Sequence, residues 1–291
     1  MDLQPLFGDF PIERFVEEYY HHLPYSAAGL AAPLLPLGDW NALLEILAQE
    51  SSDVLVCRRN EQWRGAPPRS AAQATDLLNQ GHTLLVRHAE RHDERLAEVA
   101  AAFACNFAAP VNIHLYCTPA GEFGFGWHYD AEEVFLVQTT GRKEYSLRKN
   151  TVHPWPLAET LPADMHFERE IMPVMRCELA AGDWLYVPSG YWHMGRSKKT
   201  AISLAIGIQP HAAIEVLDFL RRQLVQSIFW RQRLPVTGIA AKKSTDELRA
   251  AYERQFHEIG RELASLLASP PQAHAFLKEW EQRYVVTSTR Q

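Results

Sequence analysis

The sequence has 291 residues, of which 47% are hydrophobic and 22% charged, and its formal net charge is −6 at pH 7. This composition is ordinary for a globular protein, and the length suits one large domain or a large domain with a smaller one. The acidic balance argues against a nucleic-acid-binding surface as the main role, so no nucleic-acid partner is expected. None of the four cysteines belongs to a C-x-x-C pair, which argues against a zinc knuckle or a redox dithiol.

The chain shows no pattern for targeting or for crossing a membrane. Its first residues, MDLQPLFGDF, lack a basic region followed by an apolar stretch, so no signal peptide is expected. There is no apolar run of about 18 residues, the length that a membrane-spanning helix needs. We therefore expect a cytoplasmic protein without a membrane partner.

The first hundred residues mix helices with short strands. Asp39 is placed to cap a helix over 40–47, where apolar residues recur at i, i+3, i+4 and i+7. The apolar run 83–86 predicts a strand. Asp93 is placed to cap a further helix, whose apolar face extends over 96–103.

From about residue 111 to residue 210 the pattern changes to short strands. The expected strands are 111–117, 134–138, 144–148, 175–179, 184–187 and 201–208. Turn signals such as Ala181-Gly182-Asp183 separate several of them. Many short strands without intervening helices are typical of a barrel or a sandwich.

The last part of the chain has a helical pattern. Apolar residues recur at helical spacing over 214–228. The segment 235–244 is the expected loop. Ser244 and Glu247 then have the spacing of a capping box at the start of a second helix, and Pro270-Pro271 precedes a last one.

A metal site is predicted from His128, Asp130 and His193. In extended backbone the residues i and i+2 point to the same side, so His128 and Asp130 can converge on one ion. His193, which lies 63 positions further on (193 − 130 = 63), supplies a third ligand from another segment. Two histidines and one carboxylate on one face of an octahedron leave open positions, which is the arrangement of non-haem Fe(II) oxygenases.

These residues also have other interpretations. The chain holds 13 histidines, so an H-x-D triplet by itself is equally typical of a solvated loop histidine beside a carboxylate. The competing interpretation of His193 is a loop histidine that packs on Trp192. The strand 201–208 favours the metal site, because small and bulky residues alternate along it and its small face leaves room for a small molecule. Sheet-on-helix packing is the competing explanation for that strand.

These segments resemble the JmjC-type, cupin-like 2-oxoglutarate oxygenases, and most closely the ribosomal oxygenase branch. Residues 128–138 (HYDAEEVFLVQ) and 141–145 (GRKEY) resemble the H-x-D motif of that branch, its next strand and its G-R-K/R-x-W/Y turn. Residues 182–193 (GDWLYVPSGYWH) resemble the family segment G-D-x-L-Y-x-P-x-G-x-x-H. The resemblance covers about residues 70–230.

The resemblance implies a mainly β fold with flanking helices. It implies a JmjC/cupin double-stranded β-helix barrel over 1–210, with helices and strands at its N-terminal side, followed by a helical region over 211–291. In longer members a helical dimerisation region is followed by a winged-helix domain. The 81 residues after Pro210 (291 − 210 = 81) suffice for the helical region but not for both. The apolar helical face over 214–228 indicates a homodimer through these helices, and a helix that covers the barrel is the competing interpretation.

The implied function is that of an Fe(II)- and 2-oxoglutarate-dependent dioxygenase that hydroxylates a side chain of a protein or peptide, such as a ribosomal protein. The metal ligands given above would form its catalytic centre. Lys143 matches the basic residue that pairs with the distal carboxylate of 2-oxoglutarate. Tyr116 matches a tyrosine that hydrogen-bonds the same carboxylate, and Ser203 matches a small polar contact with the cosubstrate. A surface lysine and an ordinary strand tyrosine are the competing interpretations of the first two.

Two other functions stay open. The first is a metal-dependent cupin enzyme that does not use 2-oxoglutarate. Many such cupins use three histidines and a glutamate, so Asp130 and Lys143 argue against it. The second is a non-catalytic cupin-like binding scaffold, and the three converging ligands argue against that.

Overall fold

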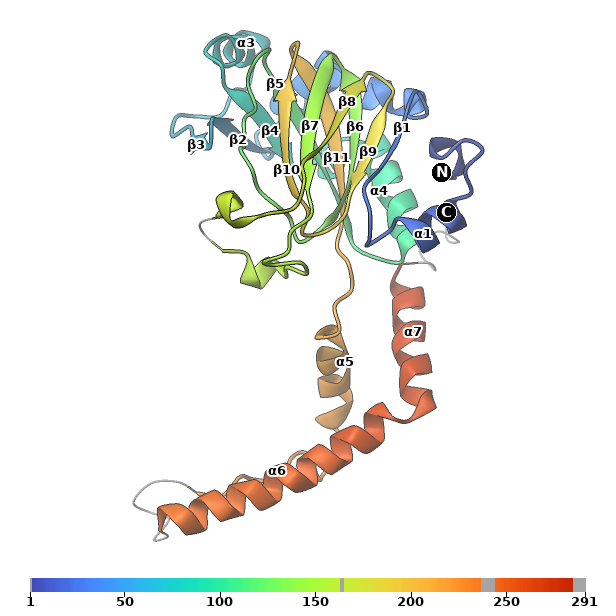
Figure 1. Ribbon diagram of the computed structural model, residues 1–291, viewed down its shortest axis with the longest axis vertical. Coiled ribbons are helices and arrows are strands. Elements are labelled where there is room, and N and C mark those ends of the chain that lie inside the picture. Colours follow the sequence, from blue (N-terminus) through green and yellow to red (C-terminus); the bar gives the residue numbers. More distant parts are fainter. Residues whose placement is uncertain (1, 163–164, 237–243, 285–291) are drawn as a thin grey trace. The chain divides into compact units, whose positions relative to one another are not determined.

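The computed structural model describes residues 2–162, 165–236 and 244–284 (Figure 1). The chain divides into two compact units, Met1–Pro210 and His211–Arg290. Whether the first is the catalytic domain and the second a dimerisation region stays a prediction.

The first unit contains two antiparallel sheets. The larger sheet consists, in spatial order, of β1 (Tyr25–Ala27), β9 (Trp184–Val187), β6 (Glu133–Thr140), β11 (Ala201–Ile208), β5 (Val111–Thr118), β4 (Thr83–Arg87), β2 (Asp53–Arg58) and β3 (Glu61–Gln62). The smaller sheet consists of β10 (Trp192–Ser197), β7 (Arg142–Arg148) and β8 (Met175–Ala180). The chain passes from one sheet to the other between β6 and β7, between β8 and β9, between β9 and β10 and between β10 and β11. The predicted mainly β, cupin-like fold with helices is confirmed.

Helices accompany the larger sheet. They are α1 (Ile12–Glu18), α2 (Trp40–Leu47), α3 (Ala71–Asn79) and α4 (Glu94–Phe107), with short 3-10 helices η1 (Gln4–Leu6), η2 (Ala32–Leu37) and η3 (Ala89–Arg91). Two further 3-10 helices, η4 (Ala158–Thr160) and η5 (Phe167–Arg169), belong to the connection between β7 and β8 of the smaller sheet. The predicted caps are confirmed. The carboxylate of Asp39 accepts a hydrogen bond from the amide of Ala42 at 2.8 Å, and Asp93 accepts from the amides of Arg95 and Leu96.

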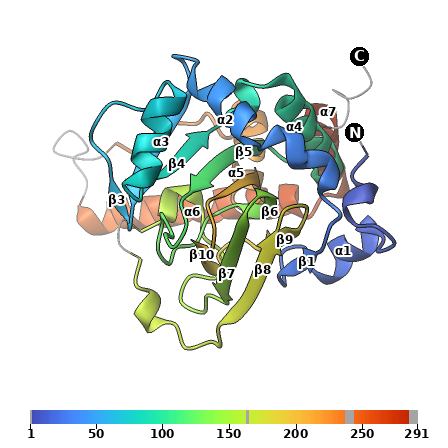
Figure 2. The same ribbon diagram turned by 90° about the horizontal axis from the view of Figure 1, so that it is seen from above.

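Helices α2, α3 and α4 lie on one side of the larger sheet and the smaller sheet lies on the other (Figure 2). Alternate residues of the strands in the larger sheet face opposite sides, so the larger sheet separates two hydrophobic cores. On β11 the bulky residues Ile202, Leu204, Ile206 and Ile208 pack in the core on the helical side. Ala205 belongs to the second core, which lies toward the smaller sheet. The predicted two-faced character of this strand is therefore confirmed.

The backbone around the candidate ligands differs from the expectation. The segment that carries His128 and Asp130 is not a strand, since its only ladder contact is an isolated bridge between His128 and His193. His193 lies inside β10, a strand that the sequence pattern did not predict. Part of β10 lines a polar pocket, so its apolar and polar residues do not alternate regularly. Its sequence therefore lacks the pattern that predicts a strand.

The second unit consists of α5 (Glu215–Leu224), α6 (Thr245–Leu267) and α7 (Pro270–Tyr284). The predicted capping box at the start of α6 is confirmed, because the amide of Ser244 donates to Glu247 Oε2 at 2.8 Å. Most of the expected loop 235–244 lies outside the described residues. None of the helices that the structure describes has both the length and the apolar character needed to cross a membrane. The expected cytoplasmic location stays a prediction.

Candidate metal centre

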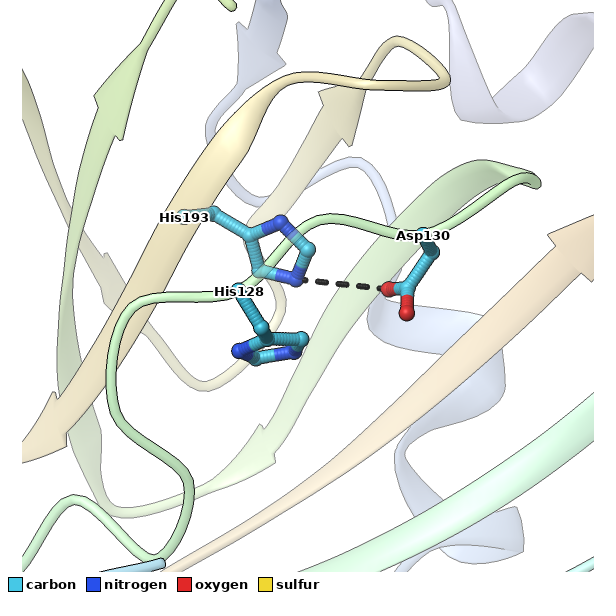
Figure 3. A group of neighbouring side chains, drawn as sticks. All are labelled: His128, Asp130 and His193. Carbon is cyan, nitrogen blue, oxygen red and sulfur yellow. Dashed lines mark ion pairs between the residues drawn. The ribbon is translucent and has the colours of Figure 1, made fainter. Parts of the chain in front are cut away.

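Three of the predicted site residues converge at one point of the first unit. His128, Asp130 and His193 each offer a ligand atom within 4.8 Å of the others, and they are the one such group of His, Cys, Asp and Glu residues in the described part of the chain. Figure 3 shows the carboxylate of Asp130 turned toward the ring of His193, with 3.5 Å between Oδ2 and Nε2. The two imidazole rings lie 4.2 Å apart between centroids.

Backbone hydrogen bonds hold the two segments of the site together. The amide of His128 donates to the carbonyl of His193 at 3.1 Å, and the amide of His193 donates back at 2.8 Å. The amide of Gly190 donates to the carbonyl of Asp130 at 2.9 Å. The loop before β10 is therefore attached directly to the H-x-D segment, and this attachment brings residues that are far apart in sequence onto one site.

Hydrogen bonds at Nδ1 fix the direction in which each histidine presents its free nitrogen. His128 Nδ1 lies 2.8 Å from the carbonyl of Gly126, and His193 Nδ1 lies 3.0 Å from the carbonyl of Tyr191. A carbonyl only accepts, so each Nδ1 carries the proton when the ring is neutral. Both Nε2 atoms then keep a lone pair for a metal, as is usual for histidine ligands that bond the backbone through the other nitrogen.

The electrostatic setting of His193 keeps its ring neutral. Its side chain is buried, and burial together with the neighbouring His128 ring lowers the pKa of His193 to about 4, against the opposing effect of Asp130. A neutral imidazole is the form that binds a metal ion. The donor set is thus ready for an ion at neutral pH without first losing a proton from this ring.

A pocket between the two sheets opens beside the three converging ligands. Its lining includes the triad and the remaining predicted site residues, Lys143, Tyr116 and Ser203. It also includes Tyr145 and Gly195 from the smaller sheet. All six predicted site residues therefore lie around one cavity, although their roles in binding stay predictions.

The lysine of this pocket is buried and has no counter-ion among the described residues. Lys143 is only 7% exposed, and no carboxylate of the described residues lies within ion-pair distance of its ammonium group. The ammonium lies 5.4 Å from the ring centres of both Tyr116 and Tyr145. Burial lowers the pKa of Lys143 to about 8. The interpretation of Lys143 as a surface charge is therefore wrong.

One neighbouring hydroxyl, that of Tyr145, also lacks a hydrogen-bond partner among the residues that the structure describes. The hydroxyl of Tyr145 is buried near Ser203 but reaches no partner with good hydrogen-bond geometry. Burial raises the pKa of both Tyr145 and Tyr116, so both hydroxyls keep their protons. These groups are available to donate hydrogen bonds to an anion in the pocket.

The family model of the JmjC domain matches residues 84–216, a segment that contains the triad and every other predicted site residue. This part of the chain is therefore similar to a JmjC domain. The resemblance drawn from the H-x-D and G-D-x-L-Y segments is thereby confirmed.

Curated relatives carry the names of oxygenases. This chain is 27% identical over 206 residues to ribosomal oxygenase 2 of Rattus norvegicus, which is 67% of this chain and 43% of that protein. It is 28% identical over 185 residues to the bifunctional lysine-specific demethylase and histidyl-hydroxylase NO66 of Drosophila sechellia, which is 61% of this chain and 28% of that protein. The chain therefore spans less than half the length of these relatives.

Solved structures share the fold. YcfD, a ribosomal oxygenase from Escherichia coli, solved in complex with cobalt and 2-oxoglutarate, matches with a TM-score of 0.63 at 18% identity over 95% of this chain and 71% of that chain. The YcfD complex with cobalt and succinic acid matches with a TM-score of 0.60. These matches extend over 95% of this chain and show that it shares their fold.

Some residues of the JmjC pocket were missed by the sequence analysis. Thr83 and Phe125 line it, but neither belongs to a motif that indicates a site. Gly195 was missed because β10 was not expected to be a strand. Tyr145 could have been predicted from the sequence, since it shares a strand face with Lys143.

Proposed function

We propose that this chain is an Fe(II)- and 2-oxoglutarate-dependent oxygenase. In this proposal His128, Asp130 and His193 hold the iron, and Lys143 binds the distal carboxylate of 2-oxoglutarate with the help of Tyr116 and Ser203. The observation that carries it is the buried ammonium of Lys143, without a counter-ion, in the pocket that contains the three converging ligands. The names of the relatives and the 2-oxoglutarate bound by YcfD support it.

The donor set fits ferrous iron. Two neutral imidazole nitrogens and one carboxylate are the ligands of the facial triad, which leaves positions open for other molecules. The Nδ1 bonds to backbone carbonyls fix both rings before a metal arrives. Catalytic zinc sites also commonly use three protein ligands. The buried ammonium of Lys143 in the same pocket favours an iron site that binds a 2-oxo acid.

The pocket also fits a dicarboxylate. A buried ammonium without a partner costs free energy, which an incoming carboxylate recovers. The hydroxyls of Tyr116, Tyr145 and Ser203 line the same pocket as Lys143 and are suited to donating to the remaining carboxylate lone pairs. The small side chains of Ser203 and Ala205 leave space for the linear carbon chain of the 2-oxo acid.

With iron and 2-oxoglutarate bound, the site would supply O₂-dependent hydroxylation of a C–H bond, with succinate and CO₂ as co-products. The residues of this chain would hold the reactants in place. His128, Asp130 and His193 orient the metal, while Lys143 fixes the far end of the cosubstrate. The walls of the two sheets exclude water from the charged end of the pocket, which strengthens each electrostatic contact there.

For the prime substrate, we propose a side chain of a protein or peptide, and a ribosomal protein is the first candidate to test. The support is the printed names of the relatives, which include ribosomal oxygenases and a histidyl-hydroxylase.

The test is succinate formation from 2-oxoglutarate with added Fe(II), with and without O₂. Native protein is expected to turn over slowly without prime substrate, and H128A to lose this turnover. K143A is expected to lose 2-oxoglutarate binding but to keep the metal. R142A is the matched control, since Arg142 is the neighbouring residue on the opposite strand face, where it pairs with Glu178 at 3.0 Å.

The outcomes separate the alternatives. Binding of metal without binding or turnover of 2-oxoglutarate would favour the metal-dependent cupin enzyme. Failure to bind either iron or 2-oxoglutarate would favour the non-catalytic scaffold and would contradict the proposal.

We also propose that the second unit pairs two copies of the chain. Helix α6 has apolar residues at helical spacing, yet none of its residues is buried. Phe256 in α6 is 62% exposed and Leu277 in α7 is 57% exposed. Light scattering on the native chain is expected to give the mass of a dimer, and F256E to give that of a monomer. A monomeric native chain would contradict this proposal.

A further inference from the structure

The turn between β2 and β3 contacts the segment that leads into the candidate metal site. The two strands form a hairpin in which Arg58 pairs with Glu61, so the turn consists of Arg59 and Asn60 alone. Both turn residues have left-handed backbone, with φ of +50° and +70°. Two-residue hairpins need this conformation, but glycine usually supplies at least one of the two positions.

Asn60 holds the backbone on both sides of Phe125. Its own amide donates to the carbonyl of Gly124 at 2.9 Å. Its side-chain Oδ1 accepts a hydrogen bond from the amide of Gly126. Gly126 is buried, and Asn60 is the one acceptor for its amide among the described residues. Without Asn60 a buried N–H group would be left unpaired, which proteins avoid.

Gly126 in turn fixes the ring of His128, because its carbonyl accepts from His128 Nδ1 at 2.8 Å. The contact between Asn60 and Gly126 leaves no room for a side chain. A Cβ on Gly126 would lie 2.7 Å from Asn60 Nδ2 and 3.1 Å from Oδ1. A continuous series of hydrogen bonds therefore connects the turn, through Gly126, to the nitrogen that sets the tautomer of His128.

We infer that Asn60 is a positioning residue for the metal site. This inference rests on the proposed function, in which His128 is a ligand. Asn60 acts through Gly126: it fixes the carbonyl that orients His128, so that Nε2 points toward Asp130 and His193. A glycine at position 60 would form the turn with less strain but would lack the acceptor that Gly126 needs. Asparagine combines a left-handed backbone with a side-chain oxygen.

The test compares three variants of the full chain by Co(II) titration, followed through the visible absorption of the bound ion. N60G keeps the left-handed turn and removes the acceptor, so its Kd for Co(II) is expected to rise about tenfold or more, the effect typical of lost support for a metal ligand. N60D keeps an acceptor oxygen and tolerates the backbone, so it is expected to bind Co(II) like the native chain. R59G relaxes the same turn and leaves the Gly126 contact in place, so it is also expected to bind normally.

The melting temperature of each metal-free variant is recorded beside the titration. The inference predicts that N60G loses Co(II) affinity while the metal-free fold is kept. Native-like affinity in N60G would overturn it, and so would a loss of affinity in N60D. A loss that merely accompanies unfolding of metal-free N60G would overturn it as well, because Asn60 would then serve the fold alone. If the native chain itself does not bind Co(II), the proposed function fails instead.

Discussion

Lys143 on β7 and Gly195 on β10 lie in direct contact across the smaller sheet. A Cβ on Gly195 would lie only 2.7 Å from Lys143 Cε, and 2.8 Å from Cε1 of Tyr145. Non-bonded heavy atoms do not lie this close together, so a side chain at position 195 would displace its neighbours. The absence of a side chain at position 195 therefore provides the space in which the lysine reaches into the pocket.

The substitution G195A should disturb the lysine without touching a metal ligand. We expect the affinity for 2-oxoglutarate to fall about tenfold, since displacement of the ammonium weakens a buried charge-assisted contact. Calorimetric titration of 2-oxoglutarate into the Co(II)-loaded protein measures this change. G260A is the control, because Gly260 in α6 has open space around it. Unchanged affinity in G195A would mean that Lys143 does not bind the cosubstrate where it lies in this structure.

The substitution K143M should abolish 2-oxoglutarate binding and yet stabilise the ligand-free protein. It replaces a buried, unpaired cation with an apolar side chain of similar length. We expect the free energy of unfolding to increase by roughly 1–3 kcal/mol, because the cost of burying the ammonium is removed. Denaturant unfolding measures the change. A clear loss of stability would show that Lys143 has a structural role that this account omits.

The affinity for 2-oxoglutarate should fall as the pH rises through about 8, the value to which burial lowers the pKa of Lys143. Above that pH the ligand-free lysine is mostly neutral, and binding must first restore its proton. We expect the affinity to fall about tenfold for each pH unit above 8. Titration with 2-oxovalerate, which has a methyl group in place of the distal carboxylate, is the control and should not show this dependence.

The lowered pKa of Lys143 also determines how the stability of the folded chain changes with pH. The pKa of Lys143 in the folded chain lies below its ordinary value of 10.5. Between about pH 8 and 10.5 the unfolded chain therefore binds more protons at this residue, so its contribution to stability increases with pH. Below about pH 8 the free-energy cost of burying the charged ammonium is fully present. The difference in unfolding free energy between K143M and the native chain should accordingly shrink over this range.

The two faces of β11 should respond differently to substitution. Leu204 is fully buried on the helical side, so L204A is expected to lower the unfolding free energy by about 2–5 kcal/mol and to leave 2-oxoglutarate affinity unchanged. Ala205 lines the pocket, so A205L is expected to block 2-oxoglutarate binding. Unfolding curves and calorimetry on both variants check the pair. Loss of ligand affinity in L204A with the fold intact would contradict this division.

The convergence of the three candidate ligands could be predicted from the sequence because each lies in a short local motif. His128 and Asp130 are two residues apart, and His193 ends a recognisable turn segment. Strands β9 and β11 were predicted at their observed bounds because their apolar or alternating residues face packed cores. Strand β10 was missed because it carries site residues, whose polarity and small size obscure a strand pattern.

Other features of the site depend on contacts that no local pattern encodes. The burial of Lys143 away from every carboxylate that the structure describes follows from how two sheets pack together. The contact between Asn60 and Gly126 joins residues 66 positions apart, through a turn that contains no glycine. Such relationships arise from the tertiary fold, so sequence periodicity does not report them.

A crystal structure of the chain with Co(II) and 2-oxoglutarate tests the central claim most directly. This account predicts anomalous density for cobalt among His128 Nε2, Asp130 and His193 Nε2, with the distal carboxylate of 2-oxoglutarate on the ammonium of Lys143. Cobalt bound elsewhere, or a cosubstrate carboxylate turned away from Lys143, would contradict it.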